Sequence, residues 1–224
     1  MNRIYLPSTS ASDWQQLLAD PDLHWKRGFS ARTLAHCWQE AGDAGWPGSV
    51  AQALHEAKLQ LELLLALPEY QVPLPGGARS SQTDLFALAR DRQSGKLTAI
   101  AIEGKVSETF GPLVGEWRGG GESGKQRRLR YLCDLLELTD DEALNVVRYQ
   151  LIHRTASAVI EAKRFDAARA MMIVHSFGTD SAGYDDYAAW ARLLGAEPAA
   201  GTVSPARAAG SRELWLGWVS GEAR

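Results

Sequence analysis

The sequence has little cysteine, no long apolar run and no excess of positive charge, and each absence excludes a class of protein. Its two cysteines, Cys37 and Cys133, are far apart and match no metal-binding spacing, which predicts free thiols. No apolar run approaches the ~20 residues of a membrane-spanning helix, and the first residues lack the apolar region of a signal peptide. We therefore expect a soluble, cytoplasmic protein with no membrane partner.

The charge balance excludes a protein that attracts nucleic acid over its whole surface. The chain carries 24 lysines and arginines against 27 aspartates and glutamates, a formal net charge of −3. A nucleic-acid partner would therefore have to meet a local basic patch. A P-loop, a dinucleotide-binding glycine motif and the Gly-x-Ser-x-Gly elbow of serine hydrolases are also missing from the sequence.

The pattern of apolar residues predicts an α/β protein of one domain. The 224 residues, 45% of them hydrophobic, are enough to bury a sizeable core. Helices are expected in residues 12–46 and at 50–67, where Pro68 would end the helix, and a first strand is expected at 70–77. Further along, the sequence predicts helices at 125–136, at about 140–163 and at 184–194, strands at 170–177 and 213–219, and a loop at 199–210.

The most informative stretch, residues 84–106, is typical of two strands joined by a tight turn. Side chains alternate along a strand, so Glu103 and Lys105 point to the same face near the end of the second strand. Asp84 begins the antiparallel neighbour, close to that end. The pattern therefore predicts that two carboxylates and one ammonium meet at one point of the sheet.

Charged groups in such apolar surroundings need a partner or a metal ion. Two carboxylates suit Mg²⁺, which binds one or two of them and keeps several waters. Lys105 beside the ion would orient or deprotonate a water, or steady a phosphoryl oxygen. An ordinary Glu–Lys pair at a strand exit is the simpler alternative.

At these residues the chain resembles the PD-(D/E)XK nuclease superfamily. The resemblance consists of Asp84 and the Glu-Gly-Lys triplet at 103–105, although Thr83 stands where that family usually has proline. It implies a restriction-endonuclease-like core, with the order α-β-β-β-α-β and a mixed sheet flanked by helices. The chain (1–224) would then consist of a helical N-terminal extension (1–48), the nuclease-like core (49–176) and a C-terminal helix and strand (177–224). The whole chain is also similar to an uncharacterised bacterial family of unknown function.

The resemblance implies Mg²⁺- or Mn²⁺-dependent hydrolysis of phosphodiester bonds in nucleic acid, with DNA as the expected substrate. Asp84 and Glu103 would hold the metal, and Lys105 would activate or orient water. Family members often place an acidic residue on the first core helix, for which Glu56 is the favoured candidate here. Several branches carry a glutamine on the helix after the lysine strand, a position that Gln150 matches.

A basic segment downstream of this site is the candidate contact for nucleic acid. It contains Arg118, Lys125, Arg127 and Arg128 around a run of glycines. A glycine-rich loop that opens a basic helix can bind phosphates through amides and side chains. The alternative is a helix face that is simply solvated.

The helix expected after residue 140 is apolar on most sides but carries one polar stripe. Its members follow each other at helical spacing: Gln150, His153, Arg154, Ser157 and Glu161. A polar stripe on a buried helix needs hydrogen-bond partners or a wet cleft. Arg154 is therefore a candidate to bind a phosphate, and a structural ion pair with Glu161 or another acid is the alternative.

Two other kinds of function stay open at this point. One is a binding module for nucleic acid or protein that keeps the fold without catalysis, and the acidic net charge favours a protein partner. The other is a small-molecule enzyme that uses the polar stripe. A homodimer is compatible with the sequence, which does not choose between DNA and RNA or between single and double strands.

Overall fold

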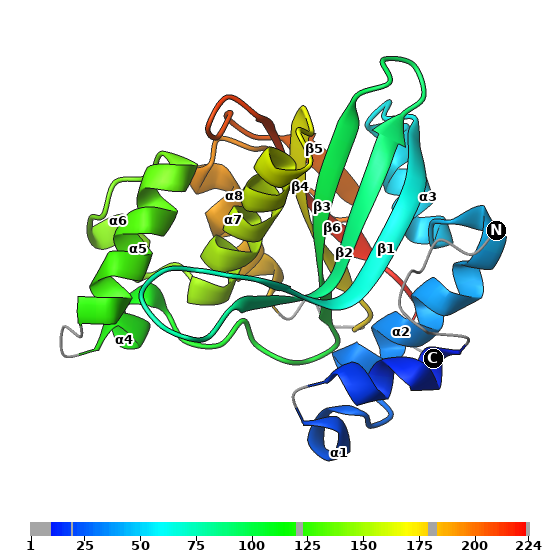
Figure 1. Cartoon of the computed structure of the whole chain (residues 1–224), viewed down its shortest axis with the longest axis horizontal. Helices are drawn as coiled ribbons and strands as arrows, with labels where there is room; N and C mark the ends of the chain where they lie inside the picture. The colour runs from blue at the N-terminus through cyan, green and yellow to red at the C-terminus, as the bar shows by residue number, and fades with distance from the viewer. Residues whose placement is uncertain (1–9, 19, 120–122, 179–182, 223–224) are drawn as a thin grey trace.

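The computed structural model describes residues 10–18, 20–119, 123–178 and 183–222. A six-stranded sheet runs through the middle of the molecule with helices on both faces, so the predicted mixed α/β class is confirmed (Figure 1). The strand order is β1-β2-β3-β4-β6-β5; β1, β2 and β3 are antiparallel neighbours, whereas β3, β4 and β6 run parallel. The strands are β1 (Leu61–Val72), β2 (Ser81–Asp91), β3 (Leu97–Lys105), β4 (Arg169–Ser176), β5 (Thr202–Pro205) and β6 (Glu213–Ser220).

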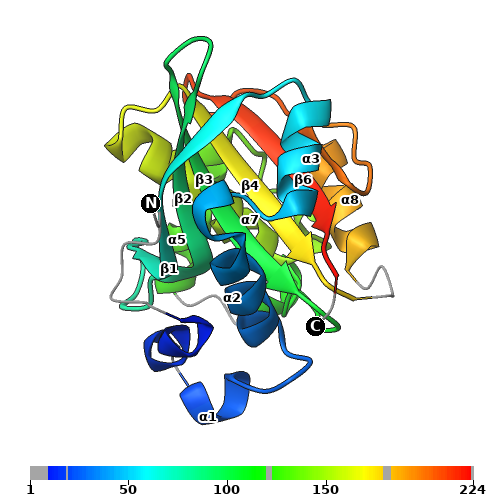
Figure 2. The same ribbon diagram turned by 90° about the vertical axis from the view of Figure 1, so that its right-hand side faces the viewer.

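The described helices divide between the two faces of the sheet. The views in Figures 1 and 2 place α5, α7 and α8 over one face and α2 and α3 over the other. None of the helices in the described ranges combines the length and hydropathy of a membrane span. The helices are η1 (Ala11–Leu17), α1 (Pro21–His24), α2 (Ser30–Ala41), η2 (Gly42–Ala44), α3 (Gly48–Glu56), α4 (Val114–Arg118), α5 (Ser123–Leu136), α6 (Glu142–Asn145), α7 (Tyr149–Arg164) and α8 (Tyr184–Leu193).

Each face of the sheet carries its own hydrophobic cluster. Along β3, Ala99 and Ala101 belong to the cluster under α7, whereas Ile100 and Ile102 belong to the cluster under α2 and α3. This is the alternation expected of a strand buried on both faces. Glu103 and Lys105 follow Ala101 by two and four residues in β3, so the same alternation turns their side chains toward α7.

The prediction of a helix at residues 50–67 is wrong for its second half, which begins the strand β1. The helix α3 ends at Glu56, and Lys58 has a φ of +59°, a left-handed conformation that turns the chain before β1. The leucine-rich residues 61–65 suit a buried strand as well as a helix. These residues pair with β2, and the pairing begins with Leu61 opposite Asp91. This pairing favours a strand over a helix.

Two smaller predictions also change. Only residues 70–72 of the first strand predicted at 70–77 are in a strand, as the end of the longer β1. The loop predicted at 199–210 contains β5, which pairs with β6. The predicted hairpin of β2 and β3 is confirmed, with the turn at residues 92–96 between them. The free thiols are confirmed as well, since neither Cys37 nor Cys133 is in a disulfide.

His175 predicts how stability depends on pH. It is fully buried, Trp38 Nε1 donates to its Nδ1 at 3.2 Å, and Ser49 Oγ lies 3.3 Å from its Nε2. Burial lowers the pKa of His175 from 6.5 to about 3, so the folded state holds it neutral. As the pH falls below 6.5, the imidazole of His175 takes up a proton in the unfolded chain but not in the folded one. The free energy of unfolding therefore falls by about 1.4 kcal/mol per pH unit between pH 6.5 and the pKa of the folded state.

The measurement is urea denaturation of wild type and His175→Gln between pH 7.5 and 4.5. We expect the variant to lose this part of the pH dependence, because glutamine binds no proton. Parallel stability profiles for the two proteins would contradict the assignment to His175.

Candidate active site

The register of β2 and β3 brings the predicted carboxylates together. Leu85 pairs with Ile102, which places Asp84 opposite Glu103. The backbone N–H of Gly104 donates to Asp84 Oδ2 at 2.8 Å, so the aspartate is fixed against the neighbouring strand. Both carboxylates line one cleft, and Lys105 lines it too. The predicted meeting of these three side chains is therefore present.

The helix α7 completes the cluster around Glu103. Arg154 Nε donates to Glu103 Oε2 at 2.5 Å, and Gln150 Nε2 donates to Oε1 at 2.6 Å. The ammonium of Lys105 lies 3.1 Å from the same Oε1 and also 3.1 Å from Gln150 Oε1. Burial on its own would raise the pKa of Glu103, but the Arg154 and Lys105 cations outweigh it and lower the pKa below its ordinary value.

Two further carboxyl groups that line the cleft, Asp84 and Glu69, are less well compensated. Burial, and next the charge of Glu103, raise the pKa of Asp84 to about 7, although Arg154 Nη2 lies 4.0 Å from Asp84 Oδ1. Burial, and next the charge of Asp84, raise the pKa of Glu69 to about 8, while Gln82 donates to Glu69 Oε2 at 2.8 Å. The cleft thus concentrates more negative charge than its two cations neutralise.

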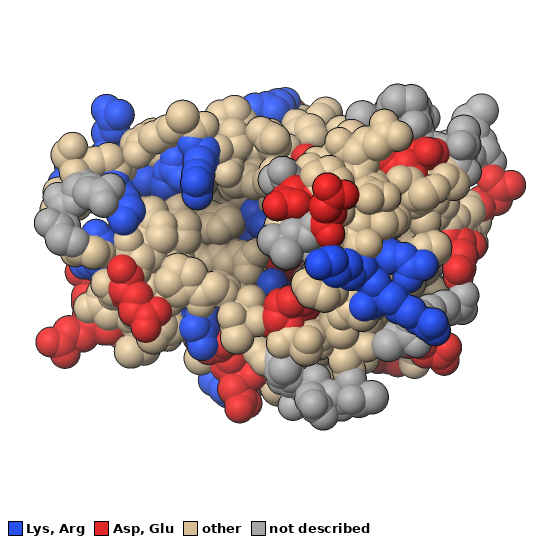
Figure 3. Space-filling model, turned by 90° about the horizontal axis from the view of Figure 1, so that it is seen from below, with Lys and Arg blue, Asp and Glu red and all other residues tan. Residues whose placement is uncertain are grey.

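The cleft has a volume of 540 Å³ and lies where β3 ends. Figure 3 looks at this end of the molecule, where the surface is hollowed and Lys or Arg atoms lie within the hollow. The charged groups form the floor, and the N-terminal helices form the opposite wall. The lining residues are Leu18, His24, Phe29, Ser30, Ala31, Glu69, Gln82, Asp84, Glu103, Lys105, Glu108, Gln150 and Arg154.

Glu108 connects the start of α2, in the wall of the cleft, with the backbone after β3, at its floor. Its Oε1 accepts from the backbone N–H of Ser30, at the start of α2, at 2.8 Å. Its Oε2 accepts from the N–H groups of Val106 and Ser107 at 2.8 and 3.2 Å, directly after Lys105. Although burial raises the pKa of Glu108, these backbone donors lower it below its ordinary value, so the carboxylate stays charged.

Sequence reasoning missed Glu69 and Glu108. Glu69 has a φ of +51° and enters the cleft only because β1 pairs with β2 at this point, a contact that no local pattern signals. Glu108 follows the triplet by three residues in a segment without periodicity. The sequence feature that could have indicated Glu108 is its position, an acidic residue three positions after Lys105.

The structure does not bring Glu56 to the cleft. It lies exposed at the end of α3, on the face of the sheet opposite α7, where Gln52 Nε2 donates to it at 2.9 Å. The prediction assumed one long helix running past the start of β2. Because α3 stops after two turns, its end stays near β5 and β6 instead.

The basic residues predicted to contact nucleic acid separate into different environments. Arg128 is 9% exposed, and its guanidinium donates to the carbonyls of Leu74, Pro75 and Gly77, which makes it a brace for the segment after β1. Arg127 is exposed on α5. Arg154 lies on the floor of the cleft.

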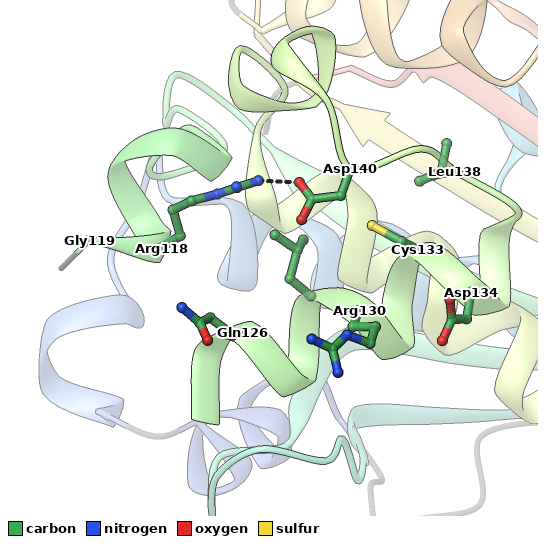
Figure 4. A pocket seen from close by; sticks show the side chains of 9 residues that line it. Arg118, Gly119, Gln126, Arg130, Cys133, Asp134, Leu138 and Asp140 are labelled. Carbon is green, nitrogen blue, oxygen red and sulfur yellow. Dashed lines mark hydrogen bonds and ion pairs between the residues drawn. The ribbon is translucent and has the colours of Figure 1, made fainter. Parts of the chain in front are cut away.

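A second cavity, of 360 Å³, lies between α4, α5 and the segment after α5 (Figure 4). Arg118 donates to Asp140 Oδ1 at 2.6 Å there, and Lys125 Nζ lies 5.9 Å from the ring centre of Trp117. Burial, and next the charge of Asp140, raise the pKa of the Cys133 thiol to about 11. The cavity therefore holds no activated nucleophile.

The donor chemistry of the cleft fits a hard divalent cation. Asp84 and Glu103 offer carboxylate oxygens, and the raised pKa of Asp84 marks a place where added positive charge would be favourable. Within the described ranges, no three His, Cys, Asp or Glu side chains are grouped as metal ligands. Mg²⁺ needs only one or two carboxylates and completes its shell with water, so this pair suffices. The metal would have to share Glu103 with Arg154.

Comparison with known proteins assigns a family without assigning an activity. No curated protein and no solved structure matches the chain. Residues 7–223 match the family described as "Domain of unknown function (DUF6946)". Because the match spans nearly the whole sequence, the chain belongs to the DUF6946 family.

Proposed function

We propose that this protein is a metal-dependent phosphodiesterase that acts on nucleic acid. The observation that carries the proposal is the shared cleft, where Asp84, Glu103 and Lys105 meet from two adjacent strands and α7 adds Gln150. Clustered titratable groups with shifted pKa values in a cleft are characteristic of functional sites.

The order of elements around the cleft supports the same proposal. Along the chain come a helix (α3), three antiparallel strands (β1, β2 and β3), then α4, α5 and α6, and after them a helix (α7) and a strand parallel to the third (β4). With α4, α5 and α6 taken as an insertion, this order is compatible with the α-β-β-β-α-β order expected of restriction-endonuclease-like cores. The functional groups lie at the start of β2 and the end of β3, as the PD-(D/E)XK motif requires.

Each residue has a distinct task in this proposal. Asp84 and Glu103 would hold Mg²⁺, which supplies Lewis-acid stabilisation of phosphate charge and a more acidic water. Lys105 presents a fixed ammonium beside the same carboxylate, where it stabilises negative charge on the reacting phosphate oxygens. Gln150 bonds both Glu103 and Lys105 and so orients them. Arg154 balances the buried carboxylates.

A second candidate, a binding module without catalysis, is favoured by one observation. Glu103 is already satisfied by Arg154, Gln150 and Lys105. A buried carboxylate with this many donors is stable without a metal. In such a module the cluster would shape the cleft, and metal would have no role.

Metal binding distinguishes the two candidates. In titration calorimetry with Mn²⁺ at pH 8, where Asp84 is ionised, we expect the wild type to bind one ion and Asp84→Asn to bind it about tenfold more weakly or not at all. Asp140→Asn is the matched control, because that carboxylate lies in the other cavity. Equal binding by the wild type and Asp84→Asn would place the ion elsewhere.

Cleavage is then tested with single-stranded DNA, duplex DNA and RNA in Mg²⁺, Mn²⁺ and Co²⁺. We expect at least one of these substrates to be cut by the wild type. If all stay intact at concentrations where calorimetry shows the metal bound, the binding module is the better description.

A further inference from the structure

The cleft joins a charged floor to an aromatic side chain at its wall. Phe29 is 38% exposed and lines the same cleft as Asp84, Glu103 and Lys105. Large hydrophobic side chains exposed to this degree are few in the described ranges: Phe29, Tyr131 and Val146. An exposed ring beside a site for charged groups fits a ligand that has both a flat apolar face and an anionic part.

The backbone at Phe29 is held by hydrogen bonds. It directly precedes α2, and its carbonyl accepts from Thr33 Oγ1 at 2.9 Å and from the Thr33 N–H at 3.2 Å. The next residue, Ser30, donates its N–H to Glu108, whose other oxygen binds the backbone just after Lys105. The backbone that carries the ring is thus connected to the end of β3 through a few hydrogen bonds, which fixes where the ring can reach.

The charged groups at the end of β3, on the floor of the cleft, are almost fully buried. Glu103 and Lys105 are 3% and 5% exposed, so a phosphate has to enter the cleft to approach them. A base pair keeps its bases stacked inside a wide duplex, whereas a single strand can place one phosphate on the floor and turn an unpaired base toward the wall. The burial of the charged groups and the exposed ring beside them therefore favour one strand over two.

We propose that the substrate is single-stranded nucleic acid, with an unpaired base stacked on Phe29 while the adjacent phosphate lies near Lys105. This inference rests on the proposed function and narrows its substrate class. Every base has an aromatic face, so the stacking contact predicts a preference for unpaired strands without a preference for sequence.

The test is fluorescence anisotropy with a short labelled single-stranded DNA, in Ca²⁺ instead of Mg²⁺ so that cleavage is suppressed. We expect Phe29→Ala and Phe29→Leu each to weaken binding by about tenfold, because neither residue stacks on a base, and Phe29→Trp to restore it. Tyr131→Ala is the matched control: this ring on α5 is exposed to a similar extent, 36%, but does not line the cleft, so its loss is expected to leave affinity unchanged.

The outcomes separate this inference from the proposed function. If Phe29→Ala binds the single strand as tightly as the wild type, or if the wild type binds a blunt duplex equally well, the stacking inference is overturned while the metal site and cleavage stand. If the wild type binds Mn²⁺ but neither binds nor cuts any nucleic acid, the proposed function and this inference fail together.

Discussion

Replacing Arg154 by methionine is expected to lower the free energy of unfolding by about 3–5 kcal/mol in the absence of divalent metal. Arg154 is 7% exposed and donates to Glu103 at 2.5 Å and to Ser81 Oγ at 3.1 Å. Methionine fills a similar space but leaves Glu103 with less positive charge beside it, in a cleft that already holds Asp84 and Glu69. Urea denaturation with a chelator present measures the change.

The control is an ion pair at the surface. Arg90 lies 3.1 Å from Glu62, but its side chain is 51% exposed, so Arg90→Met is expected to cost less than about 1 kcal/mol. If both variants lose the same stability, Arg154 contributes no more than a surface charge. The role as counter-ion of the buried carboxylates would then be excluded.

A double variant tests which carboxylate depends on Arg154. Adding Glu103→Gln to Arg154→Met removes the stranded negative charge, so most of the lost stability is expected to return. The non-additivity of the two single changes gives the interaction energy directly. A simple sum of the two losses would show that Arg154 acts through Ser81 or Asp84 instead.

Arg154→Met also tests whether a metal ion binds beside Glu103. In Arg154→Met, Lys105 is the cation left beside Glu103, and a divalent cation would replace the positive charge that the variant has lost. The rise in melting temperature with Mn²⁺ is therefore expected to be larger in the variant than in the wild type. This links the stability of the fold to the proposed use of the cleft.

Local sequence was sufficient for the hairpin and for the three groups on it. The apolar runs of β2 and β3, the turn signal between them and the period of two place Asp84, Glu103 and Lys105 correctly. The polar stripe beginning at Gln150 was also predicted to need hydrogen-bond partners, and Gln150 and Arg154 find one in Glu103. These features depend on residues close together in the chain.

The predictions failed where a choice depended on distant residues. Residues 61–65 have no period that separates a strand from a helix, and only pairing with β2 decides between them. Arg128 was predicted to contact nucleic acid, with a solvated helix face as the alternative, yet it is buried against the segment after β1. Glu69 lines the cleft and itself has a left-handed backbone conformation within β1. The sequence around Pro68 does not predict that conformation.

Lys105 is the residue on which the proposed reaction depends most. Its Nζ lies within 3.1 Å of both Glu103 Oε1 and Gln150 Oε1, and it donates to the carbonyl of Thr109 at 3.4 Å. The ring centre of Phe110 lies 4.8 Å from the same atom. The ammonium is therefore held in one place before any substrate arrives, which is the condition for strong electrostatic catalysis.

Lys105→Met is expected to slow single-turnover cleavage by about 10²–10³-fold at saturating metal, because the phosphate oxygens lose a preorganised cation as they gain charge. Methionine keeps the unbranched stem, and Arg154 still compensates Glu103, so the fold and Mn²⁺ binding should persist; circular dichroism and calorimetry check both. Lys96→Met removes the same charge from the exposed turn at the other end of β3 and should cut at the wild-type rate. A wild-type rate in Lys105→Met would reduce this lysine to a structural partner of Glu103.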